Sequence, residues 1–155
     1  MKPVAHAITG GLATLTIATF LTSTVYTELF GSKEQITAVK NAIVFPGLAI
    51  LIPLMAATGG LGRALVGGEV SPAATIKMRR MKTIALLGLF ILVPCALLLA
   101  YLARNGLIGP AFAGIQLVEV AAGATNLTLM CKNFRLGLAL SGRFRSNRHQ
   151  HAPAE

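Results

Sequence analysis

Four long apolar segments, separated by short polar connections, dominate this chain. Each reaches the ~20 residues that an α-helix needs to cross ~30 Å of hydrocarbon. Lipid offers no hydrogen-bonding partner to the backbone, so such segments cross a bilayer as helices. We predict an all-α fold, a transmembrane four-helix bundle of up-down-up-down topology over residues 1–143, with a disordered cytoplasmic tail over residues 144–155. The expected spans are residues 3–30, 36–61, 83–103 and 110–130.

The composition agrees with a membrane protein. Of the 155 residues 54% are hydrophobic and 12% charged, and none of the five acidic residues is Asp. The net charge of +9 could also suggest a nucleic-acid partner. However, the basic residues gather at the ends of the apolar segments, where the positive-inside rule explains them. We therefore expect membrane lipids, and no nucleic acid, as partners.

The distribution of Lys and Arg predicts the orientation. With a cytoplasmic N-terminus, eleven of the fourteen cations lie inside and three, Lys33, Lys40 and Arg104, lie outside. This bias predicts that both termini and the 62–82 connection are cytoplasmic. The first apolar segment is longer than a typical signal-peptide core and no A-x-A-like site closes it, so we interpret it as a span.

One face of the last span concentrates polar residues. Glu119 is the one acid that we place inside the apolar core of a span, and burial of a lone charge there is costly, so it should face the bundle. By depth we expect it level with residues 16–19, 46–48 and 94–96. Its role is either a structural hydrogen bond between helices or a proton relay. The face consists of Gln116, Glu119, Gly123, Asn126, Met130 and Asn133, at helical spacing.

The first span is rich in hydroxyl residues. On helical spacing His6, Thr9, Thr16, Ser23 and Thr27 share a face, joined by Thr19, and we expect this face to look inward. The hydroxyls either bond the carbonyl four residues earlier and allow close packing, or line a path for a solute or proton. The predicted intramembrane polar site consists of Glu119, Gln116, Asn126, Thr16, Thr19 and Ser23.

Prolines interrupt two spans. Pro46 and Pro53 predict kinks in the second span, and Pro94 interrupts the third. Gly67-Gly68 and Ser71-Pro72 are turn signals between these spans. The segment that follows them is expected to form a basic helical turn against anionic lipid headgroups, with an acidic partner protein as the alternative. Its cations are Lys77, Arg79, Arg80 and Lys82.

A metal or cofactor hypothesis rests on His6, which we expect level with residues 130–133. His6 and Met130 could ligate haem iron, and with Cys131 they could suit Cu(I). A solvated His6 is the simpler interpretation, because polar tips near a span end reach the interface. We expect no cofactor, with haem b kept as the alternative. His149 and His151 specify no metal site, and Cys95 and Cys131 lie in different spans, so we expect no disulfide.

Three motifs are similar to those of a known group. They are Lys77-Met78-Arg79-Arg80-Met81, Leu92-Val93-Pro94-Cys95-Ala96 and Gln116-x-x-Glu119-x-x-x-Gly123-Ala124-x-Asn126-Leu127-x-Leu129-Met130. Over about residues 2–143 the chain resembles a group of small, uncharacterised four-span inner-membrane proteins of bacteria. The resemblance implies a bacterial cytoplasmic membrane, and it carries no assigned activity.

Three classes of function stay open. The chain lacks G-x-S-x-G, C-x-x-C and phosphate-loop motifs, so we expect no enzyme of these kinds. The first class is a non-enzymatic accessory, assembly or oligomeric subunit that associates with other membrane proteins or with copies of itself. The second is a membrane redox module that binds haem or quinone. The third is a small proton or solute conduit that uses Glu119.

Overall fold

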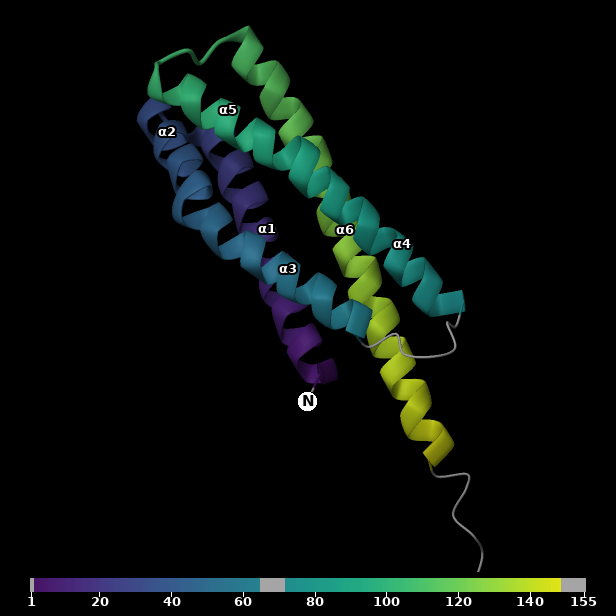
Figure 1. Ribbon diagram of the computed structural model, residues 1–155. Coiled ribbons are helices and arrows are strands. Elements are labelled where there is room, and N and C mark those ends of the chain that lie inside the picture. Colours follow the sequence, from purple (N-terminus) through teal and green to yellow (C-terminus); the bar gives the residue numbers. More distant parts are fainter. Residues whose placement is uncertain (1, 65–71, 149–155) are drawn as a thin grey trace, which may run out of the picture.

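The computed structural model describes residues 2–64 and 72–148, with side chains described over 4–64 and 75–137. It is an all-α four-helix bundle, as predicted, and the described residues contain no strand (Figure 1). The first helical run is α1 (Lys2–Phe30), and the second consists of α2 (Lys33–Ala42), η1 (Ile43–Gly47) and α3 (Leu48–Ala64). The third run consists of α4 (Pro72–Leu87), η2 (Gly88–Leu92) and α5 (Val93–Arg104), and the fourth is α6 (Pro110–Arg148).

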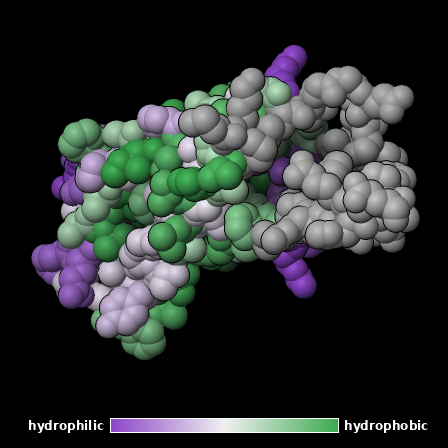
Figure 2. Space-filling view, turned by 90° about the horizontal axis from the view of Figure 1, so that it is seen from below, coloured by the Kyte–Doolittle hydropathy of each residue, from purple (hydrophilic) through white to green (hydrophobic). Residues whose placement is uncertain are grey.

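All four runs are long and apolar enough to cross a membrane. These candidate spans are Val4–Phe30, Lys33–Ala64, Thr75–Arg104 and Pro110–Gly137. Large apolar side chains on their outer faces are exposed, including Leu15 and Leu117. Figure 2 shows hydrophobic side chains over much of the coloured surface, as expected for a bundle whose solvent is lipid.

The connections described are short. Gly31 and Ser32 join α1 to α2, where the Ser32 hydroxyl accepts from the Gln35 N–H while the Gln35 side chain accepts from the Ser32 N–H. This reciprocal capping box starts α2 three residues earlier than predicted. Residues 105–109 join α5 to α6, with Gly106 at φ 69°. In Figure 1 both connections lie at one end of the bundle, and the beginning of α1 lies towards the other end.

Two prolines coincide with changes of helix type. Pro46 lies in η1, where Phe45 leaves helical geometry and the Leu48 N–H donates to the Ile43 carbonyl five residues earlier. The kink predicted at Pro46 is therefore confirmed. The η2 segment ends just before Pro94. There the Val93 N–H again donates to a carbonyl five residues earlier, that of Gly88. Because proline has no N–H, the ladder must shift around it. Pro53, in contrast, lies inside α3 without a change of helix type.

The last helix is longer than predicted. It continues to Arg148, so residues 144–148, which the sequence placed in a disordered tail, are helical. Good helix formers such as Leu, Ala and Arg dominate residues 135–145 and explain the extension. Residues 149–155, which include His149 and His151, and the turn signals Gly67, Gly68 and Ser71 lie outside the described residues.

Two apolar clusters form the core. One consists of Ala13, Ile17, Ile84 and Met130, and the other of Ile36, Leu99, Ala103 and Phe112. Along α6, Glu119 lies between Phe112, which belongs to the second cluster, and Met130, which belongs to the first. The polar residues described next therefore lie between the two clusters.

Candidate functional site

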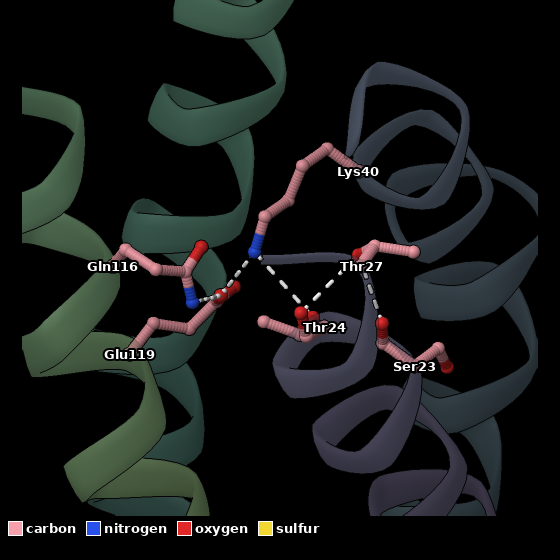
Figure 3. Close-up of polar contacts among 6 residues, drawn as sticks. All are labelled: Ser23, Thr24, Thr27, Lys40, Gln116 and Glu119. Carbon is pink, nitrogen blue, oxygen red and sulfur yellow. Dashed lines mark hydrogen bonds and ion pairs between the residues drawn. The ribbon is translucent and has the colours of Figure 1, made fainter. Parts of the chain in front are cut away.

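A buried ion pair joins the second helical run to the fourth. The Lys40 ammonium on α2 lies 2.6 Å from the Glu119 carboxylate on α6 (Figure 3). The Lys40 side chain is 1% exposed and that of Glu119 is 12% exposed. Removing two charges from water is costly, so such a pair persists only where each charge has partners of good geometry.

Two further side chains complete the set of partners. The Gln116 amide, one turn before Glu119, donates to the same carboxylate oxygen at 3.0 Å. The Lys40 ammonium also donates to the hydroxyl of Thr24 on α1, at 3.5 Å. Gln116 and Thr24 are both buried. The cluster thus ties α1, α2 and α6 together with charge-assisted hydrogen bonds (Figure 3).

Lys40 and Thr24 are the members of this site that sequence reasoning missed. Lys40 was counted among the cations outside the membrane, and Glu119 was expected level with residues 16–19. Counting from the helix ends gives a different depth: Lys40 lies seven residues after Lys33 and Glu119 nine residues after Pro110. At 1.5 Å per residue these positions lie about 10 and 13 Å from the starts of their helices. The similar depths of Lys40 and Glu119 could therefore have predicted their contact.

The inward face of α1 matches the predicted one only in part, because Thr27 is the predicted residue that is buried. The buried residues of α1 include Ala13, Ile17, Thr24 and Thr27, whereas Thr19 is exposed and Thr16 and Ser23 are half-buried. The hydroxyls of Thr16 and Thr19 donate to carbonyls four residues earlier, at 2.9 and 3.0 Å, and Ser23 donates to the Thr19 carbonyl. These bonds match the packing interpretation of the first span. Thr16, Thr19 and Ser23 do not contact Glu119 through a described hydrogen bond.

The polar face of α6 is turned inward, as its spacing predicts. Gln116, Asn126, Met130 and Asn133 are buried. The side-chain carbonyl oxygens of Gln116, Asn126 and Asn133 have no hydrogen-bond partner among the described residues. Buried amides of this kind are ordinarily satisfied by a partner or by water. The face therefore holds hydrogen-bonding capacity beyond the ion pair.

The residues of the metal hypothesis have different contacts in the structure. The His6 ring N–H at Nδ1 donates to the Thr58 carbonyl on α3 at 3.0 Å, and His6 and Met81 both border Gly62. Met130 instead packs against Ala13, Ile17 and Ile84, and Cys131 on the next position is exposed. Neither described cysteine is in a disulfide. Within the described residues no group of three or more His, Cys, Asp or Glu side chains forms a metal site.

The basic segment lies on α4, which continues directly into the third span as predicted. Arg79 and Lys82 are exposed, while Lys77 and Arg80 are half-buried. The Lys77 ammonium lies 3.6 Å from the position that a Cβ would occupy on Gly137 of α6. Two of the four cations therefore point away from the bundle.

No family model, curated protein or solved structure matches this chain.

Proposed function

We propose that this is an integral protein of the bacterial inner membrane that works without catalysis, as an accessory, assembly or oligomeric subunit. The observation that carries the proposal is the outer surface of α3. None of the residues 48–64 is buried, although α3 belongs to a candidate span. Its partner within the described chain is mainly α1, so most of its circumference is available to other membrane helices.

Small residues and one proline follow this surface at helical spacing. They are Ala49, Pro53, Ala56 and Gly60, which we call the α3 small-residue face, and all four are exposed. A Cβ on Gly60 would meet nothing within 4 Å. Because lipid tails are as apolar as a helix surface, helices associate in a bilayer where small residues let their backbones approach closely. This face suits a partner helix.

A second feature of the same face supports association. Pro53 has no N–H to donate to the carbonyl of Ala49, which lies one turn earlier on the α3 small-residue face. A carbonyl left without its helical donor in lipid is costly, and a neighbouring helix can satisfy it.

The test is in-membrane assembly of the full chain. The tagged protein is purified from bacterial inner membranes in mild detergent, and its mass and stoichiometric partners are measured by native mass spectrometry. We expect a defined complex for the wild type and its loss in Gly60→Leu. Leu117→Phe, at an exposed position on α6, is the matched control and should keep the complex.

Two results would contradict the proposal. One is a wild-type chain that is monomeric and without a stoichiometric partner in gently solubilised membranes. The other is a complex that survives Gly60→Leu and Ala56→Leu together but is lost in Leu117→Phe, which would place the interface elsewhere.

A further inference from the structure

A second carboxylate lies beside the buried ion pair. Glu28 follows Thr24 by one turn of α1, about 6 Å along the helix axis at 1.5 Å per residue. Thr24 itself accepts from Lys40. Glu28 interacts electrostatically with both Lys40 and Glu119. These observations place Glu28, Lys40 and Glu119 in one charged group contributed by α1, α2 and α6.

This group does not balance its charges. Two ionised carboxylates and one ammonium carry a net charge of −1, in an environment that desolvates them. Cys95 on α5 also interacts electrostatically with the pair, and it contributes no positive charge. Lys33 and Glu34 at the start of α2 are exposed, as is Arg104 on α5, which hydrogen-bonds Asn41. An uncompensated charge beside a buried pair is costly, so one further positive charge would stabilise the group.

The hydrogen bonds indicate which of the two carboxylates, Glu28 or Glu119, binds the further positive charge. Glu119 accepts from Lys40 and from Gln116 through one oxygen, so this carboxylate already has a cation and an amide donor beside it. Glu28 differs, because its Oε1 is buried and has no hydrogen-bond partner in the part of the chain that the structure describes. Gln116 is 6% exposed, and its side-chain carbonyl oxygen, next to the pair, likewise has no partner there.

We propose that Glu28, Lys40 and Glu119 form a proton-binding site in which Glu28 holds the proton while Lys40 and Glu119 stay charged. The ligand is a single proton, bound by formation of an O–H bond on the Glu28 carboxylate, with no electron transfer. The net charge of the group changes from −1 to 0 when the proton binds. This inference is independent of the α3 small-residue face, so either proposal can fail alone.

The test is infrared spectroscopy of the full-length protein in lipid nanodiscs at neutral pH. Because all five acidic side chains of the chain are Glu, labelling with ¹³C-glutamate shifts the band of every protonated side-chain carboxyl. We expect a protonated-carboxyl band that shifts with the label and is lost in Glu28→Gln. Glu34→Gln, at an exposed position, is the matched control and should keep it.

A second measurement needs no variant. In the nuclear magnetic resonance spectrum of ¹³Cδ-glutamate-labelled wild type, we expect one signal at the protonated position at neutral pH. Its absence in folded protein would overturn the proposal. So would a band that survives in Glu28→Gln but is lost in Glu119→Gln, or one that disappears on addition of sodium, which would identify a metal cation as the ligand.

Discussion

The Lys40 ammonium and the Glu119 carboxylate, 79 residues apart in sequence, meet at 2.6 Å between the two apolar clusters of the core. The contact joins α2 to α6, and Thr24 and Gln116 extend it to α1 and to the preceding turn of α6. It replaces the lone buried acid expected from the sequence with a matched pair of opposite charges.

Removal of the cation should destabilise the bundle more than removal of a surface cation. In Lys40→Met the Glu119 carboxylate stays buried without its main partner, and breaking one side of a buried pair costs about 3–5 kcal/mol. Lys33→Met, an exposed lysine on the same helix, is the control and should change the free energy of unfolding by less than about 0.5 kcal/mol. Unfolding in mixed detergent micelles measures both values, and equal effects would count against the buried pair.

Thr24, which is buried, should contribute more to the free energy of unfolding than Thr19, which is exposed. Thr24→Val removes the hydroxyl that accepts from Lys40, and we expect a loss of about 1 kcal/mol. Thr19→Val removes a hydroxyl that is exposed and bonded to its own helix, so the free energy of unfolding should stay within about 0.5 kcal/mol of wild type. Unfolding of the two variants side by side checks the inward face of α1, and the reverse order would restore the face predicted from the sequence.

A methyl group should not fit at Gly47. A Cβ there would lie 2.6 Å from Phe20 Cζ and 2.9 Å from the Ala42 carbonyl oxygen. We expect Gly47→Ala to cost about 1–3 kcal/mol, because both neighbours would have to shift. Gly59→Ala, where a Cβ meets nothing within 4 Å, is the matched control and should be neutral or slightly stabilising. Thermal unfolding that cannot tell the two variants apart would refute the close packing of η1 on α1.

The proposed orientation can be tested by labelling of single cysteines in a background without Cys95 and Cys131. In right-side-out spheroplasts, Lys33→Cys should react with a membrane-impermeant maleimide, whereas Arg79→Cys should react after the membrane is opened. Both positions are exposed in the structure. Labelling of Arg79→Cys and protection of Lys33→Cys in intact spheroplasts would reverse the orientation.

Much of the fold was predictable because lipid imposes strict rules on a chain. Segment length and hydropathy predicted four helices, and proline chemistry predicted the break at Pro46. The periodicity of polar residues predicted the inward face of α6, where Gln116 and Asn126 are buried. These properties are local, so a single sequence carries them.

The candidate site was only half predictable, because the rest depends on how helices rotate and slide against one another. Glu119 and Gln116 share a helix, so their contact follows from spacing alone. The contact with Lys40 requires the depth of α2, which in turn depends on the capping box that starts it at Lys33. The rotation of α1 decides that Thr24, rather than Thr16 or Thr19, is buried, and neighbouring helices set that rotation.

The most direct test of the central claim is a double-mutant cycle between residues 40 and 119. The free energy of unfolding is measured in mixed micelles for wild type, Lys40→Met, Glu119→Leu and the double variant. If the two side chains pair inside the bundle, the double variant should be more stable than the sum of the single losses predicts, by about 1 kcal/mol or more. Additive losses, with no coupling between the two positions, would contradict the buried pair.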